Sequence, residues 1–430
     1  CGKGLYSATG DDSQGACTAC NAGYFTPGRG VSGNGPSACS VCESGYSGTS
    51  NSGSSGCGIC PTSRPMSVSG NGGKPCTSTR LHCDAVDQHG NFHVVRGVTS
   101  IPNNAFQSCA KLVEVTFSAS SNLGSIGNYA FYHTGRLTSL VNIPSSLASI
   151  GMYAFQSCLK LMVVQFIGTS KLNSIDNSAF ASCQSMTELS LPASLASIGT
   201  SAFQSCTSLK TVTFGAGTSQ LATIGSSAFR YCSKMAAFSL PSYVTSIGTY
   251  AFSDTSSLAS FDTTGSHLES IGSYAFKGAG LTSFTVPSSV LSIGSNVFAG
   301  TAASISALSN VTFELSSQLL IIGSSAFAYT SIASFAVPAT TQSIATYAFR
   351  GSSLLSSVVF SCGTAVSIGS NVFVSTAVAS VALPSTASAS SGLGSSNVTT
   401  EVARTSIDSC RLCGKGLYSA TGDDSQGACT

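Results

Sequence analysis

The stretch Ser197-Ile-Gly-Thr-Ser-Ala-Phe203-Gln-Ser-Cys206-Thr-Ser-Leu209-Lys-Thr-Val212-Thr-Phe214 decides the fold, because variants of it recur along most of the chain. The phenylalanine after Ala or Val is its most regular position, and successive copies stand 22 to 29 residues apart. A period of this length indicates a repeat architecture. The phenylalanines in this position are Phe106, Phe131, Phe155, Phe180, Phe203, Phe229, Phe252, Phe276, Phe298, Phe327, Phe349 and Phe373.

One repeat is too short to bury its own apolar face, so neighbouring repeats must stack. In the segment L-x-x-V-x-F the last apolar residues alternate with polar ones, as in a β-strand with one buried face. In the arc Ile-Gly-x-x-Ala-Phe we expect Ile and Phe to point inward and Gly to permit a tight bend. Residues 98–384 are therefore predicted to form a repeat β-solenoid of about twelve turns with one continuous parallel sheet.

The pattern Ser-Ile-Gly-x-x-Ala-Phe-x-x-Cys-x-x-Leu closely resembles the BspA-like, or Treponema-type, leucine-rich repeat over about residues 98–384. Members of that family are surface proteins of bacteria and protists, and they are often implicated in adhesion. The resemblance implies a leucine-rich repeat solenoid displayed at a cell surface. It does not imply a particular ligand.

Residues 1–80 contain a ladder of Cys-x-x-Cys pairs in a segment rich in Gly and Ser. The pairs are Cys17/Cys20, Cys39/Cys42 and Cys57/Cys60, with Cys1 before them and Cys76 after them. So many cysteines indicate an oxidising compartment, and with almost no apolar residues the segment needs cross-links in place of a core. Zinc is the alternative ligand for such pairs, but a regular ladder beside Gly-Tyr favours disulfides.

The spacing of this ladder resembles the ephrin-receptor-like cysteine-rich modules of eukaryotic cell surfaces. The resemblance implies the disulfides Cys1–Cys17, Cys20–Cys39, Cys42–Cys57 and Cys60–Cys76. Closing a loop of about 15 residues stabilises a fold by roughly 3 kcal/mol in the chain-entropy model. The pattern departs from the family after Cys60, because Cys76 and Cys83 do not form a Cys-x-x-Cys pair.

Residues 1–18 and 413–430 have the same sequence, CGKGLYSATGDDSQGACT. This identity predicts a tandem array with a period of 412 residues, in which 413–430 starts the next cysteine-rich module; a short terminal duplication is the alternative. Cys410 and Cys413 would complete the pair that Cys1 alone lacks. Without a start Met or signal peptide, we expect a mature product or an interior segment. Residues 385–412, rich in Ser, Thr and Gly, read as a linker or O-glycosylated stalk.

Residues 81–97 precede the first regular turn and contain three histidines, with an acidic residue beside two of them. These histidines are His82, His89 and His93, and Cys83, Asp84 and Asp87 lie near them in sequence. A metal site is conceivable. We favour a polar N-terminal cap, which a solenoid needs at this point, and we expect no metal and no cofactor.

A cysteine stands three residues after the phenylalanine in several turns: Cys109, Cys158, Cys183, Cys206 and Cys232. We expect a column of small, buried, reduced and inert residues there. Cys362 lies outside this column, and Cys410 is its candidate partner.

Charge excludes two classes of partner. The chain has 18 Lys and Arg against 16 Asp and Glu, a net charge of +2, which gives no reason to expect nucleic acid or an anionic membrane. No apolar run approaches the roughly 20 residues of a membrane span. Charged residues make up only 8% of the chain, so the surface must consist of Ser, Thr, Gly and Asn, which protect poorly against self-association.

No catalytic constellation stands out, so the chain is not expected to be an enzyme. The outward strand positions are small and uniform, which favours packing against another copy or a glycan over recognition of a varied protein ligand. They are Thr138-Ser139, Lys210-Thr211, Ala236-Ala237, Ala259-Ser260, Thr282-Ser283, Ala333-Ser334, Ser356-Ser357 and Ala379-Ser380. Asn310 and Asn397 head N-glycosylation sequons.

The sequence therefore predicts an extracellular or cell-surface structural protein. Its units would assemble end to end into a fibre, sheath or surface appendage, with other copies of itself as partners and glycans as further candidate partners. The alternative is a surface adhesin that binds a host, cell-surface or glycan ligand through the solenoid.

Overall fold

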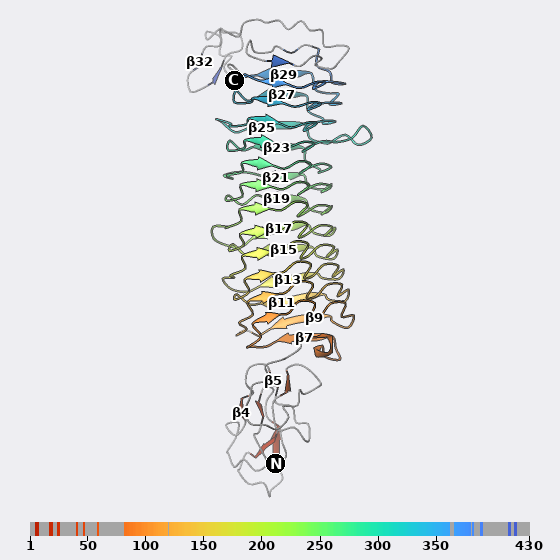
Figure 1. The fold of residues 1–430 in the computed structure, drawn as a ribbon, viewed down its shortest axis with the longest axis vertical. Coiled ribbons are helices and arrows are strands. Elements are labelled where there is room, and N and C mark those ends of the chain that lie inside the picture. The colour runs from red at the N-terminus through yellow and green to blue at the C-terminus, as the bar shows by residue number, and fades with distance from the viewer. Residues whose placement is uncertain are drawn as a thin grey trace. The chain divides into compact units, whose positions relative to one another are not determined.

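The computed structural model describes residues 81–118, 120–361, 365–379 and 381, and outside them only short strands (Figure 1). These strands are β1 Leu5–Ser7, β2 Cys17–Ala19, β3 Tyr24–Phe25, β4 Ser40–Val41, β5 Tyr46–Ser47, β6 Gly58–Ile59, β31 Ser388–Ala389, β32 Leu412–Cys413 and β33 Leu417–Tyr418. β1 with β2, β3 with β4, β5 with β6 and β32 with β33 form antiparallel pairs. Among the described residues the one helical element is the 3-10 helix η2, Cys83–Ala85.

Each turn contributes a two-residue strand with the sequence Ser-Ile or a close variant. The chain divides into two compact units, Cys1–Ser194 and Leu195–Thr430. In the first unit these strands are β8 Ser100–Ile101, β10 Ser125–Ile126, β12 Ser149–Ile150 and β14 Ser174–Ile175. They run parallel in strict register, with Ser beside Ser and Ile beside Ile.

The second unit continues the same pattern within itself. Its short strands are β16 Ser197–Ile198, β18 Thr223–Ile224, β20 Ser246–Ile247, β22 Ser270–Ile271, β24 Ser292–Ile293, β26 Ile321–Ile322, β28 Ser343–Ile344 and β30 Ser367–Ile368, and β31 pairs with the last. All pairs are parallel and in register. The predicted fold class, a parallel β-solenoid of about twelve turns, is confirmed.

A longer strand in each turn corresponds to L-x-x-V-x-F. In the first unit β7 Asn91–Val94, β9 Glu114–Phe117, β11 Ser139–Ile143 and β13 Val163–Phe166 form a parallel sheet, and β15 Glu188–Leu191 follows. In the second unit β17 Thr211–Phe214 precedes three parallel pairs. These are β19 Ala237–Ser239 with β21 Ser260–Asp262, β23 Ser283–Val286 with β25 Asn310–Phe313, and β27 Ser334–Val337 with β29 Ser357–Phe360.

The predicted parallel sheet is present but is built from the Ser-Ile strands, whereas the L-x-x-V-x-F strands form separate small sheets. Each pair in the second unit begins with a strand followed at once, or one residue later, by Pro241, Pro287 or Pro338. The partner strand lacks that proline and has a longer connection to the next Ile-Gly segment. Two kinds of turn therefore alternate, and the regular ladder runs through the Ser-Ile strands instead.

The interior is a column of phenylalanine rings. All twelve repeat phenylalanines are at most 2% exposed. In the first unit the ring centroids of Phe106, Phe131, Phe155 and Phe180 lie 5.1, 4.9 and 5.0 Å apart in sequence order. In the second unit they lie 5.3 to 5.8 Å apart from Phe203 to Phe373. Offset stacking at such distances adds to burial, which alone contributes roughly 1.5–3 kcal/mol per ring.

The glycine of Ile-Gly serves close packing between turns, not the tight bend predicted for it. A Cβ atom on Gly248 would lie 2.5 Å from the Ser226 nitrogen, and one on Gly272 would lie 2.7 Å from the Gly248 carbonyl carbon. Left-handed backbone occurs two residues later instead, for example at Tyr250 and Tyr274, with φ of 58° and 61°.

Regular pairing begins inside the segment predicted to be a cap. β7 pairs in parallel with β9, so this segment contributes a strand as well as η2. Phe92 of β7 packs against Phe106, with 4.5 Å between ring centroids. Val86 and Phe92 are buried, so the segment extends the apolar interior beyond the first repeat.

Candidate functional site

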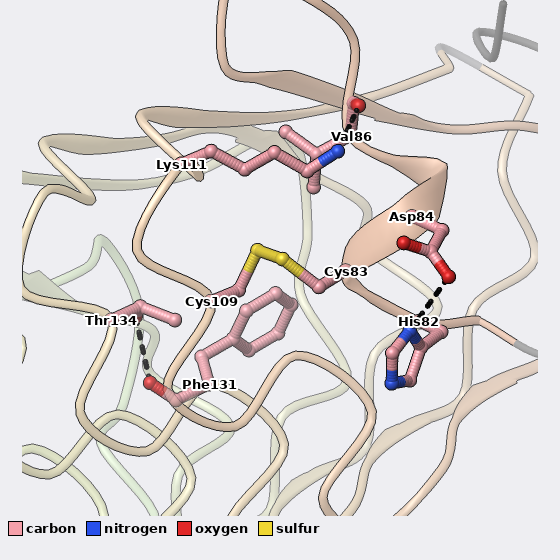
Figure 2. The surroundings of a disulfide bond; sticks show 8 residues. All are labelled: His82, Cys83, Asp84, Val86, Cys109, Lys111, Phe131 and Thr134. Carbon is pink, nitrogen blue, oxygen red and sulfur yellow. Dashed lines mark hydrogen bonds and ion pairs between the residues drawn. A yellow bond between two sulfur atoms is a disulfide. The ribbon is translucent and has the colours of Figure 1, made fainter.

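A disulfide closes the start of the solenoid. Cys83 of η2 is bonded to Cys109, with 5.4 Å between their Cα atoms (Figure 2). The Lys111 ammonium donates a hydrogen bond to the Val86 carbonyl at 2.9 Å, which fastens the same segment a second time. The prediction of a reduced Cys109 is therefore wrong. Its partner Cys83 comes from η2 and not from a stacked turn. The side chains of Cys83 and Cys109 can therefore point toward each other, whereas side chains at neighbouring positions of the cysteine column point in the same direction.

The three histidines of this segment have separate surroundings. His82 lies beside Asp84, with 3.5 Å between nitrogen and oxygen, and both side chains are exposed. His89 contacts Gln88. His93 Nδ1 lies 2.7 Å from the Thr116 hydroxyl, and partial burial lowers the pKa of His93 below its usual value. Across the described part of the chain, no three His, Cys, Asp or Glu side chains group as metal ligands would.

The cysteine column holds buried thiols at Cys158, Cys183, Cys206 and Cys232, as predicted. Cys158 donates to the Phe131 carbonyl of the preceding turn at 3.2 Å, and burial raises the pKa of its thiol to about 12. A thiol with such a pKa stays protonated at neutral pH and is a poor nucleophile. The column therefore has a structural and not a catalytic character.

Threonine and serine replace cysteine in other turns, and they too donate to a buried phenylalanine carbonyl, either that of their own turn or that of the preceding one. The Thr255 hydroxyl donates to the Phe252 carbonyl at 2.7 Å. The Ser352 hydroxyl donates to the Phe327 carbonyl at 2.8 Å. The common requirement is a small side chain that can donate a hydrogen bond to a buried phenylalanine carbonyl, which the expectation of merely small residues did not include.

The strand face of the second unit carries small polar side chains. Ser283 lies beside Asn310, and Thr285 beside Thr312, with 3.0 Å between the two threonine hydroxyls. Asn310 is exposed on this face, as a glycosylated asparagine must be. In the first unit Val163 of β13 is 45% exposed, and Leu159 and Met162, which precede this strand, are 46% and 50% exposed. The second unit also has a larger outward side chain, Val359 of β29, which is 55% exposed, so the predicted uniformity of the strand face holds only in part.

The arc after Ile-Gly carries a ladder of tyrosines that the sequence analysis missed. The Arg230 guanidinium carbon lies 4.5 Å from the ring centroid of Tyr231 and 4.7 Å from that of Tyr250. Tyr250 stacks on Tyr274 at 4.6 Å, and Arg230 is paired with Asp254 at 3.4 Å. A tyrosine recurring at the second position after Ile-Gly was the available signal. Because ring faces and the guanidinium already contact each other, this ladder stabilises the arc and is not an open binding platform.

Several predicted residues lie outside the described solenoid residues, and their assignments stay predictions. They are the disulfide candidates Cys1, Cys17, Cys20, Cys39, Cys42, Cys57, Cys60 and Cys76, the pair Cys362 and Cys410, and the sequon residue Asn397. No helix within the described residues is long and apolar enough to cross a membrane.

Comparison with protein families gives a match over most of the chain. The family described as "BspA type Leucine rich repeat region" matches in six copies, over residues 88–183, 173–304 and 269–391. Residues 1–80 lie outside this match, so their likeness to ephrin-receptor-like modules stays a prediction. No curated protein matches the chain.

Solved structures with some likeness are bacterial repeat proteins. A leucine-rich repeat protein from Bacteroides ovatus is 24% identical, with 67% of this chain and 82% of that chain covered and a TM-score of 0.43. A leucine-rich repeat protein of T. pallidum is 29% identical, with 39% and 76% covered and a TM-score of 0.35. The pneumococcal vaccine antigen PcpA is 21% identical, with 70% and 73% covered and a TM-score of 0.40.

Proposed function

Because the chain belongs to the BspA-type leucine-rich repeat family, we propose that it is an extracellular, cell-surface structural protein whose solenoids are joined into a tandem array. The array would assemble into a fibre, sheath or surface appendage. The observation that carries the proposal is the 18-residue sequence repeated without change 412 positions apart, on either side of the solenoid. No catalytic step is part of this function.

The closed start of the solenoid supports joining through the chain itself. Cys83–Cys109 and the bond from Lys111 to Val86 fasten a covering segment onto the first turn. Buried Val86 and Phe92 extend the interior into that segment, so the first repeat does not present a bare apolar end. The linker 385–412 and the cysteine-rich segment 1–80 are the proposed joints. Covalent linkage would give weak contacts between solenoids a high effective concentration.

The strand face of the second unit supports side-by-side packing. Its side chains are small and mostly uncharged, and the chain as a whole has only 8% charged residues. Few like charges therefore oppose dense packing of copies. N-linked glycans at Asn310 and Asn397 are part of the proposal as partners of this surface.

A surface adhesin is the second candidate, and one observation favours it. Leu159, Met162 and Val163 expose large apolar side chains on one turn of the first unit. Packing between copies through the strand face of the second unit does not explain these exposed apolar side chains. Binding of a ligand at a cell surface would explain them.

A comparison of one repeat with two tests the array. We expect a secreted protein with two tandem 412-residue copies to associate at lower concentration than one copy, as measured by sedimentation velocity. A single-copy protein with Asn310→Gln serves as the control for glycan effects. Identical monomeric behaviour of both lengths over the whole concentration range would contradict the structural function and favour the adhesin.

A further inference from the structure

Three basic side chains stand above one another on successive turns of the first unit: Lys111, Arg136 and Lys160. The Thr138 nitrogen bonds the Val113 carbonyl at 2.7 Å and the Met162 nitrogen bonds the Thr138 carbonyl at 2.9 Å, which holds these turns in register. Each basic residue stands two positions before one of these three residues and just before a buried leucine. Neighbouring turns are separated by about 4.8 Å in such a ladder. The three cations therefore form a column, which we call the basic column.

The charges of the basic column are not balanced by ion pairs. All three side chains are exposed, and within the described residues none forms a salt bridge with Asp or Glu. Lys111 uses one of its three N–H donors on the Val86 carbonyl. Like charges that lie above one another on adjacent turns repel each other. Only ten Lys and Arg occur between residues 81 and 381, so three in one column is a concentration that folding alone does not require.

An apolar strip lies beside the basic column. Leu159, Met162 and Val163 flank Lys160 in sequence, and each exposes about half of its side chain. Glu114, the acidic residue nearest to Lys111 in sequence, accepts a hydrogen bond from Ser139 at 3.0 Å and is engaged within the sheet. On the next turn Ser185 replaces the cation, and its hydroxyl donates to the Leu159 carbonyl, so the column ends there.

We propose that the basic column and the apolar strip bind an acidic polysaccharide. Carboxylate or sulfate groups pair with Arg136, which takes such groups with two parallel hydrogen bonds, and with the two lysines. The apolar C–H faces of the sugar rings lie against Met162 and its neighbours. An extended polysaccharide repeats its charged groups at regular intervals, and the column offers one cation per turn. This binding does not depend on the array, since every residue belongs to one solenoid unit.

The test is affinity chromatography on immobilised dextran sulfate. Immobilised neutral dextran and immobilised single-stranded DNA serve as comparison matrices. In the full chain, Arg136→Gln with Lys160→Gln removes two charges from the basic column. Lys171→Gln with Lys210→Gln removes two exposed charges elsewhere and is the matched control. We expect the wild-type chain and the control to be retained on dextran sulfate at low salt. The column variant should elute at clearly lower salt, with at least a several-fold loss of affinity.

Two outcomes would overturn the proposal. Equal elution of the two double variants would mean that net charge alone drives retention. Stronger retention on single-stranded DNA than on dextran sulfate would assign the column to a nucleic acid. The variant Met162→Ser tests the apolar strip separately: it should weaken binding without changing the salt dependence, and unchanged affinity would remove sugar packing from the account. Unchanged urea unfolding of each variant shows that the fold is intact.

Discussion

At the scale of single residues, the position three after each phenylalanine shows one backbone requirement met by different side chains. Cys158 and Thr255 both donate to a buried phenylalanine carbonyl. The Phe131 carbonyl also accepts a hydrogen bond from the Thr134 hydroxyl at 2.7 Å, so the Cys158 thiol adds a further bond with a net contribution of about 0.5–1.5 kcal/mol. Cys, Ser and Thr are small enough to fit here and each carries a donor, which explains why the column varies only among such residues over most turns.

We expect Cys158→Ser to be tolerated, because serine keeps a donor for the Phe131 carbonyl. Cys158→Val should cost about 0.5–1.5 kcal/mol, because it removes the thiol that bonds the Phe131 carbonyl and the Thr134 hydroxyl, while Thr134 still donates to that carbonyl. Urea unfolding of the two variants measures the difference. A valine variant as stable as the serine variant would show that size alone governs the column.

We expect Gly248→Ala to destabilise the solenoid by about 1–3 kcal/mol, since the new methyl group would meet the backbone of the preceding turn. Gly135→Ala is the control, because no atom lies within 4 Å of its Cβ position. Thermal unfolding of both variants checks the expectation. Equal melting temperatures would mean that the turns shift apart without cost.

The protonation of His93 should make stability depend on pH. Burial disfavours the charged imidazole, so the folded state holds its proton less tightly than the unfolded state, where the pKa is about 6.5. This contribution is fully present above the unfolded pKa, and it is lost as pH falls through that value toward the lower folded pKa. We expect the urea concentration at the unfolding midpoint to decrease as the pH is lowered from about 7.5 to about 5. The decrease should be smaller in His93→Gln. An equal drop in both proteins would assign the effect to other groups.

At the scale of elements, the period of the phenylalanines was enough to predict the solenoid and its interior column. The pairing of the longer strands was not predictable from that period, because it depends on the length of the connection after each strand. Pro241 marks a short connection, while Phe214 is followed by a longer one. The tyrosine ladder was missed because outward positions were considered only on strands, whereas Tyr250 and Tyr274 lie on the arc.

The disulfide of the cap was also beyond the repeat pattern, because η2 interrupts the periodicity before the first turn. Cys83 and Cys109 are 26 residues apart. Closing a loop of this length stabilises by about 3 kcal/mol in the chain-entropy model. We expect Cys83→Ser with Cys109→Ser to lose about that much locally and to expose residues 81–98 to faster amide hydrogen exchange. A protection pattern identical to that of the wild-type chain would show that Lys111 and the buried Phe92 hold the segment without the bond.

At the scale of the whole molecule, a nearly neutral, charge-poor chain places three of the ten Lys and Arg between residues 81 and 381 in one column of the first unit. The basic column and the apolar strip belong to the first unit, while the strand face of the second unit carries mostly small side chains, with Val359 as a larger exception. This division allows one solenoid to hold a surface ligand on one part and to pack against neighbouring copies with another. Composition alone predicted packing between copies but not ligand binding, because a net charge of +2 gives no indication of a local cluster of cations such as the basic column.

The central claim is that solenoids of this kind are joined in a tandem array, and electron microscopy of the native surface material tests it most directly. The measured quantity is the axial repeat, compared with the mass and length of one 412-residue period. We predict fibres in which each axial repeat contains one solenoid and one cysteine-rich segment. Separate particles, each with a single solenoid and no regular axial repeat, would contradict the array.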